Sequence, residues 1–584
     1  MEQLKRLLRE VKEFKVAALI TPLFMLLEVF CETLIPFLMA SIIDDGVEAG
    51  NMNHIFLIGI LMIVVAGVGL FGGIMGGVFG AKASTGFAKN LRESMFNHIQ
   101  TFSFSNIDKF STAGLVTRLT TDVTNLQNSF QMCLRMAMRA PASLICALVM
   151  AFSINAKISM VYLIAVLLLA VVLFFIIRRA TATFKEAFPK YDELNASVQE
   201  NVSAIRVVKA YVREEEETRK FHRASKAIRD IFTKAEKNVI VNQPVMQLTV
   251  YTCIILISWL GAKMIVGGEL STGELMSLLA YCMNILMNLM MLSMIFVMLS
   301  MSTASVGRIY EVLTEESDLK NPENPVLEVA DGSIVFKDVE FAYKQGAEEP
   351  ILKDIDLEIK SGETIGILGG TGSGKTSLVN LISRLYDATK GEVIVGGRNV
   401  KEYDMEALRN QVSVVLQSNV LFAGSIYDNL RWGDENATEE ECQRACQLAC
   451  ADEFISRFPD GYETHIEQGG TNVSGGQKQR LCIARALLKK PKILILDDST
   501  SAVDTATDAK IRKAFREAIP GTTKIIIAQR VSSIQEADRI IVMEDGKIDA
   551  FDTHERLLET NEIYREVFES QTGGDGDFDE KEGI

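Results

Sequence analysis

Long apolar stretches separated by charged segments dominate the first half of the chain. Four of them contain no charged residue over about 20 positions or more, the length that a helix needs to cross ~30 Å of hydrocarbon. Two weaker stretches contain Glu28 and Glu32 in one case and Pro141 in the other. The six predicted membrane helices cover about residues 16–43, 55–81, 132–156, 158–177, 238–262 and 275–307. The pattern therefore predicts a six-helix transmembrane domain over residues 16–316.

Lysine and arginine are unevenly distributed among the segments that flank these helices. Segments 1–15, 82–118 and 178–237 are basic, whereas 44–54 and 263–274 are short and acidic or nearly neutral. Because basic loops stay on the cytoplasmic side, both termini are predicted to be cytoplasmic. The chain is thus expected to be a multi-pass protein of the cell (plasma) membrane, with long cytoplasmic helix extensions.

The first fifteen residues alternate apolar and basic positions with the period of a helix. Leu4, Leu7, Leu8, Val11 and Phe14 fall on one face, and lysines and arginines lie opposite. This pattern is typical of an elbow helix lying in the membrane interface over residues 1–15. The alternative is a basic leader that only flanks the first span.

After Arg308 the pattern of apolar and polar residues becomes typical of a soluble domain. Residues 317–333 are predicted to be a linker, 334–572 an α/β domain, and 573–584 an acidic tail. Short β-branched runs alternate with helical patterns in this domain, which favours a mostly parallel sheet flanked by helices. The predicted strands are Ile334–Phe336, Thr364–Leu368, Val412–Leu416, Ile493–Leu496, Thr523–Ile527 and Arg539–Val542.

Composition narrows the function without identifying it. The formal net charge of −15 argues against a nucleic-acid partner. Nine cysteines scattered over 584 residues do not form a disulfide framework. Cys442, Cys446 and Cys450 share one helix face, but their spacing is not that of a zinc site, so core packing is the favoured interpretation.

A glycine-rich loop between the predicted strand 364–368 and the predicted helix 377–385 carries the clearest chemistry. It reads Gly369-Gly370-Thr371-Gly372-Ser373-Gly374-Lys375-Thr376-Ser377, with the spacing of a phosphate-binding loop. Glycines let backbone N–H groups turn toward phosphate oxygens, and the helix N-terminus adds its positive end. We therefore expect Lys375 to reach the β- and γ-phosphates and Thr376 to bind Mg²⁺.

Two later segments fit the same chemistry. The apolar strand 493–496 runs into Asp497 and Asp498, and the C-terminal edge of such a sheet is where ligands bind. Asp497 is therefore the expected partner of Mg²⁺. Ser474-Gly475-Gly476-Gln477 opens a predicted helix and forms another anion cradle.

Together these motifs resemble the ABC exporter family, in which six membrane helices are fused to a P-loop nucleotide-binding domain of ABC type. The resemblance implies ATP and Mg²⁺ as cofactors. Ser474–Gln477 matches the family's signature motif. Tyr343 matches the aromatic residue that stacks on adenine, and Asp504 lies in a segment that resembles the D-loop. The residues that the resemblance places around Mg²⁺ are Thr376, Gln417 and Asp497. In the membrane half, Phe110–Leu119 resembles the first coupling segment, and Gln199-Glu200 with Ile205–Tyr211 resembles the second inner loop.

Three positions depart from the family pattern. The family has Glu after the Mg²⁺ aspartate and His in a later motif, where this chain has Asp498 and Gln529. The Asp498 carboxylate is shorter by one methylene, roughly 1.5 Å. The third departure is Glu467-Gln468-Gly469-Gly470, where Gly-Glu is usual. The catalytic set implied by the resemblance is thus Lys375, Asp498 and Gln529.

These departures bear on the assembly, because the family encloses two ATP molecules between two nucleotide domains. Each site combines one subunit's phosphate loop with the other's signature motif. The pattern resembles the degenerate-site subunit of bacterial heterodimeric multidrug-type ABC exporters, whose partner would supply Glu and His. The alternative is a homodimer with modest activity at both sites, since Asp498 is still a carboxylate.

The predicted function is that of an exporter subunit that moves an amphiphilic substrate (drug-like, lipid or peptide) out of the cytoplasm by alternating access. The alternatives are a homodimeric lipid or peptide flippase and a regulatory ATP-binding subunit with little turnover. Glu28 and Glu32 share a helix face and either attract cationic amphiphiles or pair with Arg139 or a partner group. The methionines of the last span suit an adaptable cavity, although packing filler is the more favoured interpretation.

Overall fold

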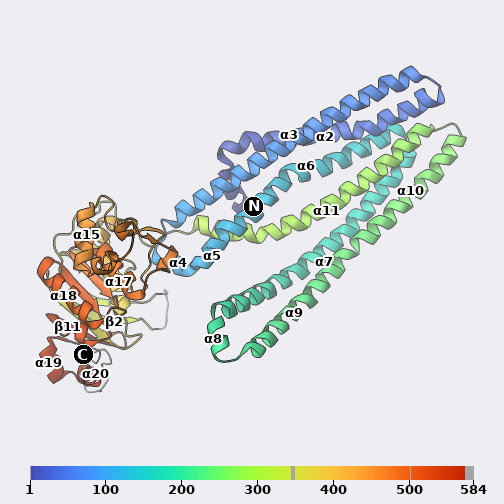
Figure 1. Ribbon diagram of the computed structural model, residues 1–584. Helices are drawn as coiled ribbons and strands as arrows, with labels where there is room; N and C mark the ends of the chain where they lie inside the picture. The colour runs from blue at the N-terminus through green and yellow to red at the C-terminus, as the bar shows by residue number, and fades with distance from the viewer. Residues whose placement is uncertain (1, 344–348, 500, 573–584) are drawn as a thin grey trace. The chain divides into compact units, whose positions relative to one another are not determined.

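The computed structural model describes residues 2–343, 349–499 and 501–572 (Figure 1). The predicted acidic tail 573–584 lies outside the described residues. The chain divides into a membrane unit, Met1–Thr101 with Phe110–Glu315, and a soluble unit, Phe102–Lys109 with Glu316–Ile584.

Long helices make up the membrane unit, and six helices of its described part are long and apolar enough to cross a membrane. This confirms the predicted six-helix membrane domain. Figure 1 shows α7 and α9 running alongside each other and joined by the short α8 (Ile205–Ala210). The long helices are α2 (Lys15–Ser41), α3 (Met52–Ile99), α6 (Val123–Ile154), α7 (Ala156–Ser203), α9 (Glu214–Ile240), α10 (Asn242–Val266) and α11 (Thr272–Thr314).

The N-terminal segment is not one continuous helix. It forms α1 (Glu2–Leu8) and a 3₁₀ helix (Arg9–Phe14), with Lys12 at a left-handed φ of 40°. Glu10 is buried beside α3, where it accepts a hydrogen bond from the Ser94 hydroxyl (2.7 Å) and pairs with Lys12 (2.9 Å). The amphipathic period of this segment therefore breaks where a buried carboxylate has to meet its partners on α3.

Small residues bring α3 close to α2. At Gly72 an added Cβ would lie 3.1 Å from the backbone oxygen of Phe24, and at Gly76 it would overlap the Met25 side chain. Glycines one turn apart allow membrane helices to approach closely. At Gly73, on the same stretch, an added Cβ would lie 3.2 Å from the Glu28 carboxyl carbon. The α2–α3 contact therefore places Glu28 directly against the α3 backbone.

Two sheets form the centre of the soluble unit. The six-stranded sheet has the order β12-β11-β3-β10-β9-β6, with only β12 antiparallel to its neighbour. A four-stranded antiparallel sheet has the order β2-β1-β4-β5. The strands of the first sheet are β3 (Thr364–Gly369), β6 (Val412–Val415), β9 (Ile493–Asp497), β10 (Thr523–Ile527), β11 (Arg539–Glu544) and β12 (Lys547–Asp552). Those of the second are β1 (Ile334–Phe341), β2 (Leu352–Ile359), β4 (Lys390–Val395) and β5 (Arg398–Asn399).

Five of the six predicted strands lie in the mostly parallel sheet, which confirms the α/β fold class. Ile334–Phe336 was wrongly expected there, because it begins β1 of the antiparallel sheet, where Ile334 pairs with Ile359 and Val395. Its β-branched run shows that it is a strand but does not determine which strand it pairs with. Alternate strand residues enter separate apolar cores, with Leu494 and Leu496 in one and Ile493 and Ile495 in the other.

The soluble unit includes a short segment of the membrane half, because α4 (Phe104–Phe110) begins within it. The Tyr386 hydroxyl donates to Asp108 Oδ2 (2.8 Å), and its ring lies edge-on to Phe104 with centroids 6.0 Å apart. Ser105 donates to Asp318 Oδ2 (2.8 Å). These contacts come from residues just upstream of Phe110–Leu119, the segment that resembles the first coupling segment of the family.

Three cysteines predicted to pack rather than bind metal are buried in one core. They lie on or just after α15 (Glu439–Leu448), and burial raises the pKa of each thiol. A raised pKa keeps a thiol protonated and poorly suited to metal binding. The packing prediction is therefore confirmed for Cys442, Cys446 and Cys450.

Candidate functional site

The phosphate loop joins β3 to α12 (Lys375–Ile382) at the C-terminal edge of the parallel sheet. Gly372 and Gly374 have left-handed φ values of 86° and 96°, which side chains rarely adopt. Gly370 and Gly372 face open space, since an added Cβ would meet no atom within 4 Å. The remaining loop residues, Thr371 and Ser373, continue the turn. The loop thus leaves room on the side where an anion would approach its backbone N–H groups.

Lys375 folds back over this loop. Its Nζ donates to the carbonyl oxygens of Gly369 (2.9 Å) and Gly370 (2.7 Å). Burial lowers the pKa of Lys375, while the charges of Asp497 and Asp498 act in the opposite direction. The partly desolvated Lys375 ammonium group is bound by carbonyl oxygens, and a charge-assisted hydrogen bond to an anion would stabilise it further. Lys375 and the loop therefore fit a phosphate group.

Two hard oxygen donors lie beside the loop. Thr376 Oγ1 donates to Asp497 Oδ2 at 2.9 Å, and Asp497 is buried at the end of β9. Burial raises the pKa of Asp497, and the Thr376 hydrogen bond partly offsets this. Hydroxyl and carboxylate oxygens fit Mg²⁺, which commonly completes its shell with phosphate oxygens and water. In the described part of the chain no group of three or more His, Cys, Asp or Glu could hold a metal alone.

The two departures from the family pattern are in contact with each other. Gln529 Nε2 donates to Asp498 Oδ2 at 2.9 Å. The side chain of Gln417, which follows β6, also acts on the Asp498 carboxylate. Burial raises the pKa of Asp498, while both amides and Lys375 act to lower it. The short carboxylate is therefore hydrogen-bonded by the neutral Gln529 amide, a contact that the sequence did not reveal.

Tyr343 lies beside the phosphate loop, where its hydroxyl is 3.0 Å from the hydroxyl of Ser377. Its ring contacts Phe341 and Tyr386 edge-on, with centroid distances of 4.8 and 5.0 Å. The side chain is also partly exposed, at 42% of its full area. An exposed ring fixed next to a phosphate site is suited to stack on a nucleotide base.

The signature segment opens α17 (Gly475–Leu488). Ser474 is its N-cap and forms a reciprocal capping box with Gln477. Gly476 packs on the loop before α18 (Thr505–Ala518), where an added Cβ would lie 2.7 Å from the backbone oxygen of Ala502. No hydrogen bond or ion pair among the described residues joins 474–477 to the phosphate loop.

Asp504 caps the next helix. Its side chain accepts from the Thr507 backbone N–H (2.8 Å) at the start of α18, and these hydrogen bonds lower the pKa of Asp504. An ionised carboxylate at a helix N-terminus is stabilised by the helix dipole. The D-loop carboxylate is thus already used as a cap within its own domain.

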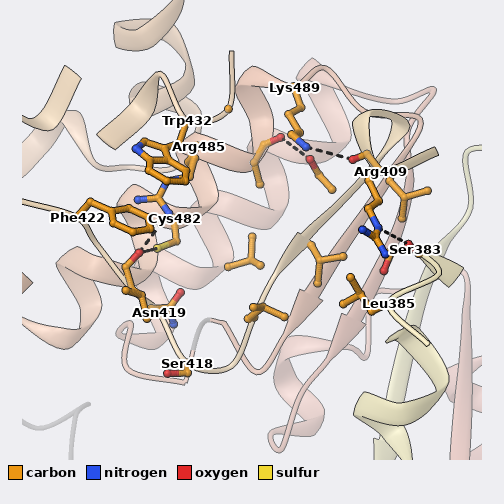
Figure 2. Close-up of a pocket in the computed structure, with 18 of the residues that line it drawn as sticks. Ser383, Leu385, Arg409, Ser418, Asn419, Phe422, Trp432, Cys482, Arg485 and Lys489 are labelled. Carbon is orange, nitrogen blue, oxygen red and sulfur yellow. Dashed lines mark hydrogen bonds between the residues drawn. The ribbon is translucent and has the colours of Figure 1, made fainter. Parts of the chain in front are cut away.

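A groove that the sequence did not reveal lies between β6 and α17 (Figure 2). Its cavity measures about 380 Å³, and at one end the exposed rings of Phe422 and Trp432 stack at 4.0 Å. The heads of Arg409, Arg485 and Lys489 line its wall, and burial lowers the pKa of each. No motif marks these residues, and two exposed aromatics ten positions apart were the only available signal.

Comparisons with known proteins agree with this architecture. Residues 18–308 match the model of the ABC transporter transmembrane region, and residues 352–501 match that of the ABC transporter. The chain is 35% identical over 573 residues to the uncharacterized ABC transporter ATP-binding protein YfiB of Bacillus subtilis, covering 98% of this chain and 99% of that protein. It is 36% identical over 543 residues to the uncharacterized ABC transporter ATP-binding protein Rv1273c of Mycobacterium tuberculosis, covering 92% and 93%.

A solved structure shares the whole fold. The structure of a bacterial Atm1-family ABC exporter with ATP bound superposes with a TM-score of 0.83 at 23% identity, covering 96% of this chain and 99% of that one. A P-loop domain fused to membrane helices defines an ATP-coupled membrane transporter. This chain belongs to the ABC transporter family, with an exporter-type fold. It is accordingly a multi-pass membrane protein of a family whose members use ATP and work as dimers.

Proposed function

We propose that this chain is one half of an ABC exporter that moves amphiphilic substrates out of the cytoplasm by alternating access, with its termini cytoplasmic. Its partner is a different chain that carries Glu and His where this chain has Asp498 and Gln529. The hydrogen bond from Gln529 to Asp498 (2.9 Å) is the observation that carries the proposal. It supports a nucleotide site that retains ATP and hydrolyses it slowly.

The argument for slow hydrolysis rests on position and charge. When bound, ATP with Mg²⁺ supplies the reacting phosphoryl group and a charge-neutralising ion. Lys375 and the loop backbone would bind the phosphates, and Thr376, Gln417 and Asp497 would hold the metal. Asp498 would have to orient water from a carboxylate set back by roughly 1.5 Å. A misplacement of about 1 Å can reduce the rate on the order of 10²-fold.

The signature segment has a different role in this proposal. Ser474–Gln477 keeps every family residue, and the Ser474 capping box orients the first turn of α17. Its hydroxyl and backbone N–H groups would face the ATP held by the partner's phosphate loop. This chain would then complete the fast site while its own site remains slow.

A homodimeric flippase remains the second candidate, because Asp498 retains a carboxylate whose charged form is favoured by Lys375. Rates of ATP hydrolysis by the chain alone and by the complex isolated from its own membrane separate the candidates. The heterodimer requires a second polypeptide in a one-to-one ratio and a much higher rate for the pair. A dimer of this chain alone with the full rate contradicts the proposal, and negligible hydrolysis by either preparation favours a regulatory subunit.

The contact between Tyr386 and Asp108 gives a prediction about coupling. Asp108→Ala removes the acceptor of the Tyr386 hydroxyl, so α4 loses one hydrogen bond to the rest of the soluble unit. We expect the amount of fluorescent amphiphile transported per ATP hydrolysed to fall roughly twofold to tenfold, as one lost hydrogen bond implies. Uptake into inside-out vesicles measures this ratio. A double-mutant cycle with Tyr386→Phe is the control, and additive losses would show that the bond carries no coupling.

A further inference from the structure

Four charged side chains meet inside the predicted membrane spans, around one cavity of about 500 Å³ between α2, α3 and α6. Arg139 on α6 pairs with both carboxylates of α2, through Nη1 to Glu28 Oε1 (3.2 Å) and Nη2 to Glu32 Oε2 (2.9 Å). Two interpretations of these carboxylates were open, attraction of a cationic amphiphile and pairing with Arg139 or a partner group. In the structure both carboxylates pair with Arg139. Arg135 lines the same cavity one helical turn away.

Arg135 differs from Arg139 in its surroundings. Its Nε is buried without a hydrogen-bond partner, and no ion pair involving it occurs among the described residues. The stem of Arg135 packs against α3, where an added Cβ at Gly80 would lie 3.3 Å from its Cδ. An unpartnered charge within a span is costly and usually marks a functional site.

Negative charge is in excess around Arg139, where two carboxylates pair with one arginine. Glu28 and Glu32 share a single arginine, and the Glu32 side chain is 45% exposed. The four charges thus sum to zero, but one arginine serves both carboxylates while Arg135 stands outside these ion pairs. Arg135 and Glu32 both line this cavity, so a ligand that fills it can contact both side chains.

We propose that this cavity binds the headgroup of a zwitterionic amphiphile. Its phosphate or carboxylate would accept hydrogen bonds from Arg135, and its ammonium group would lie against Glu32. The inference rests on the proposed transport function and names its substrate class. It also argues against the alternative that Glu28 and Glu32 attract cationic amphiphiles, since Arg135 would repel a cation.

Three probes with the same tail test the assignment: dodecylphosphoethanolamine, dodecyl phosphate and dodecylammonium. Binding is measured by scintillation proximity on the nucleotide-free complex in dodecyl maltoside, an uncharged detergent. We expect the zwitterion to bind at least tenfold more tightly than either of the other two probes. Arg135→Gln should shift the preference to dodecylammonium and Glu32→Gln to dodecyl phosphate, while Arg135→Lys keeps the original order.

The reciprocal change in preference is a result that general damage to the fold would not give. Removing an uncompensated charge should also leave the Tm of Arg135→Gln equal or higher, whereas loss of a structural ion pair would lower it. An unchanged order of probes in both variants, or a wild-type preference for dodecylammonium, overturns the proposal. Equal competition by free phosphoethanolamine overturns the assignment to an amphiphile. Binding by a complex that does not hydrolyse ATP would refute the proposed transport function alone.

Discussion

Restoring the family residues, by Asp498→Glu with Gln529→His, is expected to raise ATP turnover at this chain's own site on the order of 10²-fold. The change returns a carboxylate to its full reach and replaces the amide that now donates to Asp498 Oδ2. An imidazole in that place can carry a charge toward phosphate, which an amide cannot. The increase is best measured as steady-state phosphate release by the complex in a Ser474→Arg background, where the site completed by this chain's signature is blocked.

The blocked background matters because a fast site would hide a slow one. In the unblocked complex even full restoration adds only a second site of similar rate, so the total would rise at most about twofold instead of about 10²-fold. Asp498→Asn in the Ser474→Arg background is the matched control, and it should remove the residual slow turnover. If the restored residues leave the rate of the blocked complex unchanged, Asp498 and Gln529 are not what limits this site.

The sequence predicts the nucleotide site well because its chemistry depends on residues close together in the chain. A phosphate loop needs glycines, Lys375 and Thr376 within eight positions, and Asp497 is placed by its own strand. Parallel strands β3, β10 and β9 then bring these segments to one edge, with Ile527 paired to both Ile367 and Asp497. Local patterns therefore predict the parts, and the sheet order brings them together.

Contacts between distant segments were harder to predict. The Gln529–Asp498 hydrogen bond joins residues 31 positions apart and depends on β9 lying beside β10. The pairing of Arg139 with Glu28 depends on how α6 is rotated against α2, which hydrophobic periodicity does not define. The break at Lys12 likewise follows from the partners of Glu10 on α3. For Asp498 and Glu10 the residue types were visible but their partners were not, and for Glu28 the residue Arg139 was only one of several possible partners.

The charged cavity in the membrane unit and the nucleotide site share one physical feature: each contains a charged side chain that has no oppositely charged partner in hydrogen-bonding contact among the described residues. Arg135 leaves a charge unpaired inside a span, and Asp498 is a carboxylate hydrogen-bonded by a neutral amide. Neither arrangement adds stability, since each keeps a polar group in a poorly solvated place. Both are therefore better explained by function than by folding.

The second large effect is expected from Ser474→Ala, which should reduce ATP hydrolysis by the complex at least tenfold. In the proposed assembly this hydroxyl faces the partner's ATP, and a lost hydrogen bond to a charged group corresponds to roughly ten- to hundredfold in rate. Lys375→Ala, which alters only this chain's slow site, should by contrast leave most of the turnover intact. Phosphate release by the purified complex, at equal protein concentrations, measures both.

Loss of the helix cap is the competing explanation, because Ser474 also caps α17 and removing an N-cap costs about 1 kcal/mol of stability. Ser425→Ala is the matched control, since Ser425 forms the same kind of capping box with Asp428 on α14 (Ile426–Leu430). If Ser425→Ala lowers the Tm as much but keeps the turnover, the effect of Ser474 belongs to the shared site. Equal losses from Ser474→Ala and Lys375→Ala would instead mean two equivalent sites in a homodimer, with Asp498 acting in both.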